Sequence, residues 1–271
     1  MNVIASHRPP EARIQSIARA KAILDVLAAQ AGWVRLRDVT ARTGLVKATV
    51  FNLITALVEV GIVEHDQSQG AYRLGLQALV YGRAVERRLD IVALMRPYLV
   101  KLCAETSETV NLALPGPLEC IIVESLEGSQ NLRVTAYTGT RASYHATACG
   151  RALLAYQPEA ARRHVLELAS LMPLTPHTTT DIDAIETILA NCRRDGYVCE
   201  VEENEIGGAC VAAAVVVDGK AVASVSVAGP AFRMDVEKRA RLGRLLVKAL
   251  AAAARDLNTV LAASGGMAAG P

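Results

Sequence analysis

Long apolar runs, paired cysteines and aromatic residues are all scarce in this sequence. The longest uncharged apolar run, 206–217, stops at Asp218 and is shorter than the ~18 residues a membrane-spanning helix needs. The amino terminus carries two prolines and no apolar core of signal-peptide length, so no export signal is expected. The six cysteines include no CxxC pair, which favours reduced, mostly buried thiols over disulfides or structural zinc. We therefore expect a cytoplasmic protein with no membrane span, no cofactor and no metal.

The aromatic residues bear on the kind of nucleic acid the chain could bind. Two Phe, one Trp and seven Tyr are too few and too dispersed for the stacking platforms of single-strand and RNA binders. Residues 1–89 hold twelve Lys and Arg against seven Asp and Glu, a net +5, whereas the rest carries −3. This basic excess at the front makes duplex DNA the better candidate partner.

The composition is that of a folded protein with more than one domain. The AVILMFWYC set makes up 52% of the sequence and charged residues 21%, which allows real cores and excludes a disordered chain. A length of 271 residues exceeds the ~100 to 200 residues of a usual domain. We therefore expect two domains.

The first part of the chain has the pattern of a winged helix-turn-helix, 13–75. Apolar residues recur at helical spacing over 14–29, a two-turn helix is expected just before Gly44, and a third helix follows over 47–60. The period then changes to that of a small hairpin over 62–74. Residues 1–12 are expected to form a disordered arm, and 76–89 a linker helix.

The second part, 90–258, is predicted to be an α+β domain with an antiparallel sheet. It opens with a helix over 90–105. Short β-rich runs follow at 109–114, 119–126, 132–137, 197–202, 210–218 and 222–229. Helices are expected between and after them at 150–156, 158–169, 181–195 and 234–257. The last residues, 259–271, are rich in Gly and Ala and are expected to be disordered.

The third helix of the front domain has an outward face suited to the major groove. Its apolar stripe points inward, which leaves on the other side Ala48, Phe51, Asn52, Thr55 and Glu59. Asn52 can bond an adenine edge and Phe51 can pack on a thymine methyl. Further residues are suited to phosphate oxygens: Lys47 and Thr49 at the helix start, Arg42 in the turn and Arg73 in the wing.

Several longer segments carry a family resemblance. The first half contains SIARAKAILDVLA and GLVKATVFNLITALVEVGIVEHDQSQGAYRLG. The second contains YHATACGRALLA, LTPHTTTD, GYVCEVEENEIGGACVAAAVVVDG and VASVSVAGP. In order and spacing, from about Arg13 to Leu257, they resemble the IclR family of bacterial transcriptional regulators. The resemblance implies a homodimer or tetramer whose operator binding is controlled by a small molecule held in the second domain.

The expected ligand is an organic acid, bound between the sheet and the helix that opens at Gly150. Unsatisfied backbone N–H groups at a helix amino terminus attract a carboxylate, and here they belong to Ala148, Cys149 and Gly150. By match to the family's pocket motif, the residues implied to line the site are Glu200, Cys210 and Ser226. Those implied near its mouth or behind it are His145 and Arg151.

The chain departs from the family pattern at both sites. Most members have Ser or Thr in place of Ala48 and Arg in place of Asn52, and both side chains usually serve DNA contact. They tend to have Lys in place of Arg151, Pro in place of Ala214 and Ser in place of Ala228. One alternative is therefore a regulator that no longer responds to an effector.

A second alternative is a cysteine-dependent enzyme. Cys149 or Cys210 would be its nucleophile and His145, four residues before Cys149, its base. Packing alone also explains both cysteines, because cysteine is among the most buried residue types. In the acidic cluster near Glu200, we expect Glu203 and Glu205 to be solvated.

Overall fold

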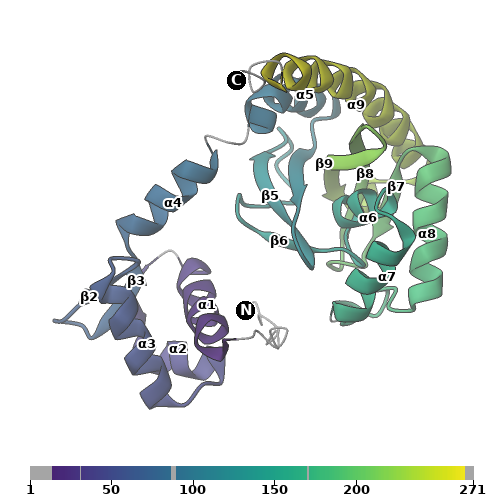
Figure 1. Cartoon of the computed structure of the whole chain (residues 1–271). Helices are drawn as coiled ribbons and strands as arrows, with labels where there is room; N and C mark the ends of the chain where they lie inside the picture. The colour runs from purple at the N-terminus through teal and green to yellow at the C-terminus, as the bar shows by residue number, and fades with distance from the viewer. Residues whose placement is uncertain (1–13, 31, 87–89, 170, 266–271) are drawn as a thin grey trace. The chain divides into compact units, whose positions relative to one another are not determined.

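The computed structural model describes residues 14–30, 32–86, 90–169 and 171–265 (Figure 1). They belong to two compact units, Met1–Leu89 and Asp90–Pro271. The arm predicted over 1–12 lies outside the described residues. Among the described residues no single helix is long and apolar enough to cross a membrane; α2 and α3, bent by 116°, meet that test only as a pair.

The first unit is a winged helix-turn-helix, as predicted. Its elements are α1 (Gln15–Ala28), β1 (Val34–Arg35), α2 (Leu36–Thr43), α3 (Lys47–Glu59), β2 (Val63–Asp66), β3 (Ala71–Leu74) and α4 (Leu76–Glu86). The three strands form an antiparallel sheet in the order β1-β3-β2. Strand β1 was not predicted, because two residues are too few to show a period. The last three residues of the predicted linker, 87–89, lie outside the described residues.

A small core fixes the position of α3. Val50 and Ile54 are fully buried and pack with Ile23 of α1 and Val39 of α2. The turn between α2 and α3 depends on Gly44, whose φ of +66° is in the left-handed region that favours glycine. The turn and the core together present the opposite side of α3 to solvent.

The second unit is built on a six-stranded antiparallel sheet in the order β6-β5-β4-β9-β8-β7. The strands are β4 (Thr109–Pro115), β5 (Glu119–Leu126), β6 (Arg141–Ser143), β7 (Val198–Val201), β8 (Gly208–Val217) and β9 (Lys220–Pro230). The helices are α5 (Asp90–Thr106), α6 (Ala148–Ala155), α7 (Glu159–Leu168), α8 (Ile182–Asp195) and α9 (Val236–Gly265), with a 3₁₀ turn at Ala231–Arg233. The α+β class with an antiparallel sheet is thus confirmed.

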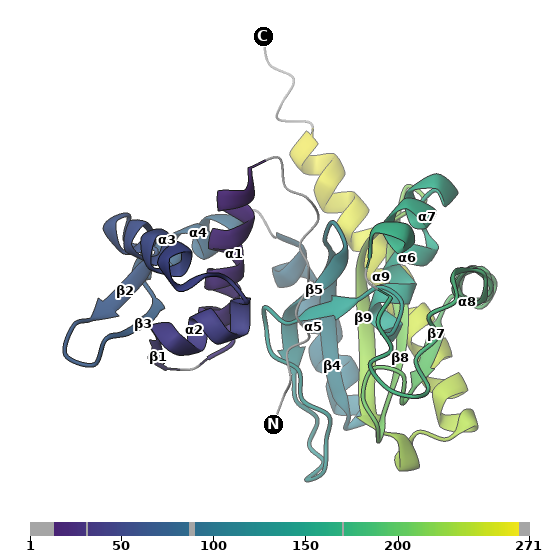
Figure 2. The ribbon, with the colours of Figure 1, turned by 90° about the horizontal axis from the view of Figure 1, so that it is seen from below.

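The two faces of this sheet have separate cores. Helices α5 and α9 pack on one face against alternating strand residues such as Val211 and Val225. Helices α6 and α8 belong to the other core, with strand residues such as Ala212 and Ala113 (Figure 1). Figure 2, in which the view is turned about the horizontal axis, shows the strands β4, β9, β8 and β7 side by side in this order. The alternation within β8 follows from the two-residue period of a strand.

The prediction of a strand over 132–137 was wrong. This segment forms no ladder, and the edge strand is β6 instead. Side chains take up two of the segment's carbonyl groups: Thr109 Oγ1 donates to Val134 O at 2.6 Å, and Arg233 donates to Leu132 O at 2.8 Å. The apolar alternation resembles a strand, but sequence alone does not show that these hydrogen bonds compete with pairing.

Helix α9 extends further than predicted. It continues to Gly265 and so includes the start of the segment 259–271 that we expected to be disordered. That segment is rich in small apolar residues, but alanine, which is one of them, is also the strongest helix former. Residues 266–271 lie outside the described residues.

Candidate DNA-binding and effector sites

The outward face of α3 is open to solvent. Ala48, Phe51 and Asn52 are exposed, with Phe51 52% exposed despite its apolar ring. Thr49 and Thr55 are half-buried at its edge. An aromatic ring and an amide exposed side by side are suited to base edges in the major groove.

Positive charge and unsatisfied donors surround the start of α3. Lys47 and Arg42 are exposed. The residue before the helix is Val46, which has no side-chain oxygen, and no side chain caps the first turn. The first N–H groups of α3 are therefore available to a phosphate at the positive end of the helix dipole.

Arg73, the predicted phosphate contact of the wing, is also bound within the wing itself. It lies opposite Glu64 across β2 and β3, and its guanidinium forms a 2.7 Å ion pair with that carboxylate. Its Cζ also lies 4.4 Å from the ring centre of Trp33. The cation therefore stabilises the wing, and only part of it faces outward.

In the second unit, strand register places the predicted lining residues on one sheet face. Glu200 pairs with Cys210 across β7 and β8. On the same face of the sheet, Ser226 of β9 pairs with Ala212 on one side and Asn111 on the other. This is the face that packs on α6.

Asn111 is a site residue that sequence reasoning missed. It is 5% exposed, its Nδ2 is 3.5 Å from Ser226 Oγ, and its Oδ1 accepts from Ser125 Oγ at 2.8 Å. A buried amide inside an apolar strand pattern is the signal that could have identified it, since buried polar groups need hydrogen-bond partners.

The first turn of α6 meets this face with fewer free donors than predicted. Thr147 is the N-cap: its Oγ1 accepts from Gly150 N at 3.1 Å and donates to Ser143 O at 2.6 Å. The Gly150 N–H is therefore already bonded. Among the three predicted carboxylate donors, Ala148 and Cys149 remain as candidates.

Glu200 is the buried acid of the site, with 5% of the residue exposed. Its Oε1 accepts from the N–H groups of Glu203 and Asn204 at 2.7 and 3.0 Å. Burial outweighs these bonds and raises the pKa of Glu200 to about 7. Near neutral pH the carboxyl can therefore donate a proton to a ligand or accept one from it.

Cys210 lies next to Glu200 within this polar cluster. Burial, with the nearby Cys149 and Glu200, raises the pKa of the Cys210 thiol well above its usual value. Cys210 is therefore a neutral thiol at physiological pH.

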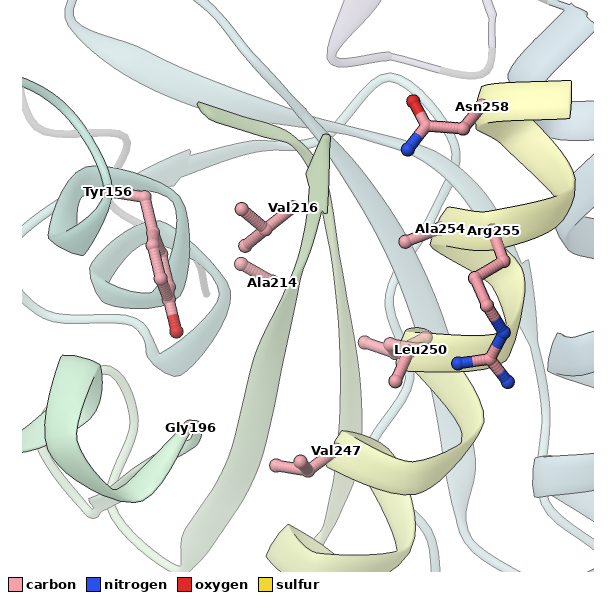
Figure 3. A pocket seen from close by; sticks show the side chains of 10 residues that line it. Tyr156, Gly196, Ala214, Val216, Val247, Leu250, Ala254, Arg255 and Asn258 are labelled. Carbon is pink, nitrogen blue, oxygen red and sulfur yellow. The ribbon is translucent and has the colours of Figure 1, made fainter. Parts of the chain in front are cut away.

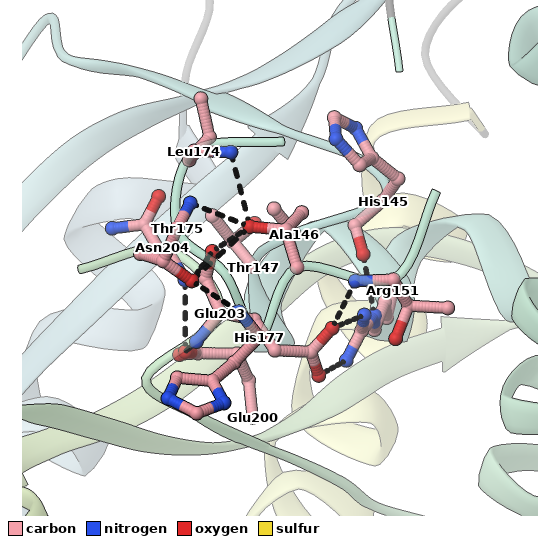
Figure 4. A network of polar contacts seen from close by, with 12 residues as sticks. His145, Ala146, Thr147, Arg151, Leu174, Thr175, His177, Glu200, Glu203 and Asn204 are labelled. Atoms are coloured by element: carbon pink, nitrogen blue, oxygen red, sulfur yellow. Dashed lines mark hydrogen bonds and ion pairs between the residues drawn. The ribbon is translucent and has the colours of Figure 1, made fainter. Parts of the chain in front are cut away.

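Arg151 lies behind the site rather than at its mouth, which is one of the two placements that the family resemblance implied. It is fully buried, and its guanidinium forms two 2.6 Å bonds to Glu203 and a third to His145 O, also 2.6 Å (Figure 4). Our prediction that Glu203 is solvated was therefore wrong. Sequence alone did not pair the two because they are 52 positions apart.

The loop between α7 and α8 completes this network. Thr175 Oγ1 donates to Glu202 O and Thr178 Oγ1 donates to Glu203 O, each at 2.6 Å (Figure 4). Thr179 N also donates to the Glu203 carboxylate at 2.9 Å. The network holds the turn between β7 and β8 whose N–H groups bind Glu200. The clustered threonines of LTPHTTTD were the available signal.

His145 is buried and does not act on Cys149 in this structure. Its Nε2 lies 3.1 Å from Met172 O, and burial lowers the pKa of the ring. The thiol of Cys149 instead contacts Thr147 Oγ1 at 3.5 Å. The base and nucleophile expected of a cysteine enzyme are not brought together by these contacts.

A surface cavity of about 380 Å³ lies elsewhere in the unit. Its lining includes Tyr156, Ala214 and Val216 on one side and Val247 and Leu250 of α9 on the other (Figure 3). None of the predicted effector residues lines it. Ala214, where a family member tends to have proline, therefore faces this cavity.

Comparison with known proteins identifies both domains. Residues 16–67 match the family model of the IclR helix-turn-helix domain. Residues 83–259 match that of the bacterial transcriptional regulator IclR C-terminal domain. The chain belongs to the IclR family of transcriptional regulators. The first match runs from α1 to the end of β2, and the second from the end of α4 into α9.

Relatives of this IclR-family chain are similar over almost their whole length. The transcriptional regulator XynR of Escherichia coli strain K12 is 32% identical over 90% of this chain and 97% of its own. The repressor AllR of the same strain is 29% identical, over 91% and 90%. The chain thus combines a DNA-binding domain with the family's effector domain.

Solved structures show the same architecture. The IclR of Thermotoga maritima has a TM-score of 0.67 and 28% identity, covering 90% of this chain and 98% of its own. An IclR homologue from Microbacterium hydrocarbonoxydans, solved with 4-hydroxybenzoate, has a TM-score of 0.71 and 24% identity, covering 89% and 99%. At that identity the second likeness concerns the fold.

Proposed function

We propose that this IclR-family regulator binds a duplex operator through α3 and that a small organic acid in the second unit controls this binding. The observation that carries the proposal is the burial of Glu200 on the sheet face that packs on α6, a polar group beside an apolar core. A regulator of this kind has to share a compartment with the chromosomal DNA that it binds, which agrees with the expected cytoplasmic location.

The DNA-reading half of the proposal rests on α3. Asn52 and Phe51 are the proposed base contacts, with Ala48 and Thr55 beside them. Arg42, Lys47 and Thr49 are the proposed phosphate contacts, and Arg73 supports the wing. Lys47 and Asn52 are exposed, so changing them should leave folding intact.

Gel shifts with the chain's own promoter region test this half. Asn52→Ala should weaken operator binding by about 1 to 3 kcal/mol and relax base preference at one position. Lys47→Ala should weaken all sequences alike and reduce the salt slope by about 1. Lys101→Ala, an exposed lysine on α5, is the matched control. Equal operator affinity in all four proteins would count against the assignment.

The acid-binding half rests on the arrangement around Glu200. The proposed ligand carboxylate lies at the start of α6, near Ala148, Cys149 and Gly150, where the helix dipole is positive. Glu200, Cys210 and Ser226 are the proposed lining residues. His145 and Arg151 are proposed to support the site from behind.

Thermal melts with a panel of acids test this half. The panel includes glyoxylate, small aliphatic acids and 4-hydroxybenzoate, the molecule bound by the Microbacterium homologue. A ligand at 100 times its Kd adds about 2.7 kcal/mol to the free energy of unfolding. Ser226→Ala should reduce the shift, whereas Cys192→Ser in α8 should not. No shift with any acid would favour a regulator without an effector response.

Iodoacetamide labelling separates the regulator from the cysteine enzyme. An activated thiolate reacts quickly near neutral pH, whereas a packed thiol does not. We expect Cys210 to react slowly in the native protein. Rapid labelling of Cys149 or Cys210, together with turnover of an acyl substrate, would support the enzyme instead.

The proposed assembly is a homodimer or tetramer. Helix α4 carries large apolar side chains that are more than half exposed: Leu76, Leu79, Val80 and Tyr81. Leu76, Leu79 and Val80 lie on one side of the helix at i, i+3 and i+4 spacing, and such a strip is suited to a second copy of the chain. Two copies would present two copies of α3 to successive half-sites.

A further inference from the structure

Two thiols meet beside the proposed acid site. Cys120 lies in β5 and Cys149 in the first turn of α6, and their Sγ atoms are 3.8 Å apart. Both residues are at most 5% exposed, and the two segments are 29 positions apart in sequence. The core between the sheet and α6 contains both residues and therefore holds the two sulfurs in contact.

The two thiols have different neighbours, and this difference determines which of them reacts first. The Cys149 sulfur lies at the positive end of α6, 3.5 Å from Thr147 Oγ1. Hydrogen bonding from Cys120 lowers the pKa of the Cys149 thiol although burial opposes this. Hydrogen bonding to Cys149, together with burial, raises the pKa of Cys120 well above its usual value. Cys149 is thus the sulfur that reacts first, and Cys120 the sulfur that follows.

We propose that Cys120 and Cys149 form an oxidisable dithiol, a modification site at which a small hydroperoxide links β5 to α6 through a disulfide. Closure brings the sulfurs from 3.8 Å to about 2.05 Å, a movement shared between two side chains. The burial of both sulfurs selects the oxidant by size. Hydrogen peroxide fits this requirement, whereas the disulfide of glutathione does not.

The chemistry balances with the hydroperoxide as the sole oxidant. The Cys149 thiolate attacks one peroxide oxygen, the O–O bond breaks, and the departing alkoxide or hydroxide takes up the thiol proton. The resulting sulfenic acid is then attacked by the Cys120 sulfur. The S–S bond forms, the S–O bond breaks, and hydroxide leaves with the Cys120 proton as water. Two electrons pass from the two thiols to the peroxide.

Peptide mapping of the full-length protein tests the proposal. The reduced protein is treated with hydrogen peroxide, blocked, denatured and digested with trypsin without reductant. The expected product joins peptide 142–151, which contains Cys149, to peptide 102–133, which contains Cys103 and Cys120. Fragmentation of this product should place the link at Cys120. Free thiols should fall from six to four per chain and return after dithiothreitol.

Matched cysteine variants assign the bond. Cys120→Ser and Cys149→Ser should abolish the cross-link, whereas Cys103→Ser and Cys192→Ser should retain it. If a serine variant misfolds, the fragmentation of the wild-type product still decides between Cys103 and Cys120. A bond from Cys149 to another cysteine, sulfinic acid without any bond, or faster reaction with glutathione disulfide would each overturn the proposal.

The bond has a consequence for ligand control that rests on the proposed acid site. Linking Cys149 to β5 fixes the first turn of α6 and consumes one wall of that site. The thermal shift given by a binding acid should therefore be reduced in the oxidised protein and restored by dithiothreitol. If the disulfide forms and the thermal shift is unchanged, the effect on acid binding is contradicted. If no disulfide forms, the modification site itself is contradicted.

Discussion

At the scale of single residues, Glu203 and Glu200 of the effector unit are in different states. Glu203 is paired with the buried Arg151, and hydrogen bonds from Arg151 keep the pKa of Glu203 low despite partial burial. Glu200 accepts only backbone N–H bonds, and burial keeps its pKa high. The Arg151 charge thus holds the loop in place, and Glu200 is left able to change protonation.

Glu200 should make stability depend on pH. Its pKa rises from 4.5 to about 7 on folding, so between these values the folded state binds more protons than the unfolded state. The free energy of unfolding contributed by Glu200 therefore falls as pH rises through this window, by about 1 to 3 kcal/mol. Glu200→Gln should remove that fall. Urea unfolding at pH 5 and pH 8 measures it, and parallel pH profiles for the two proteins would contradict the role.

Glu203 should be more important for stability than its neighbour Glu205. Glu203→Gln leaves the fully buried Arg151 without its carboxylate, which should lower the free energy of unfolding by about 3 kcal/mol. Glu205→Gln changes an exposed residue and should stay within about 0.5 kcal/mol of wild type. Urea denaturation of both variants makes the comparison. Equal stability would show that the ion pair contributes little.

The position of a residue was predictable where a strand or helix period sets it. Glu200, Cys210 and Ser226 reach one sheet face because a two-residue period fixes the face of each. The Arg151–Glu203 pair and the Thr147 cap depend on contacts made by loops. Loop contacts have no period, which is why Glu203 was predicted to be solvated.

At the scale of elements, α6 depends on close approach to the segment before it. A side chain at Gly150 would collide with Ser143 O and would bring its Cβ to 2.7 Å from Tyr144 Cα and 2.8 Å from Thr147 Oγ1. These are backbone atoms and a cap hydroxyl that cannot easily move. The tight junction sets the start of α6 and thus the position of its first-turn donors.

Gly150→Ala should therefore destabilise the second unit by about 1 to 3 kcal/mol and reduce acid binding. Gly82→Ala in α4 is the matched control, because nothing lies within 4 Å of its added Cβ and alanine favours a helix. The control should be neutral or slightly stabilising. Thermal melts and acid-induced shifts of both variants give the measurement, and a stable Gly150→Ala that still binds acid would contradict the role.

Long elements were more predictable than short ones. The apolar stripe of α3 predicted the bounds of this helix to within one residue, because its apolar residues recur at helical spacing. The segment 132–137 has a strand-like alternation, yet its carbonyl groups bond to Thr109 and Arg233. A period indicates which side chains can be buried, and it does not show which backbone groups find a partner.

At the scale of the whole molecule, the self-association that we propose through the exposed side chains of α4 can be tested by mutation. Leu79→Glu should weaken the proposed dimer, because burying a carboxylate in an apolar interface is costly. Light scattering should then show a smaller particle, and operator affinity should fall because both half-sites are no longer bound together. Leu168→Glu, at the end of α7 and equally exposed, is the control. An unchanged mass would place the interface elsewhere.

The division of the apolar interior also has a thermodynamic consequence. The helix-turn-helix encloses Ile23, Val50 and Ile54 in a core of its own, apart from the two cores of the sheet. Heating should therefore give two endotherms in scanning calorimetry, since each unit loses its order cooperatively but not in concert with the other. Operator DNA should raise the midpoint of one transition and a bound acid that of the other.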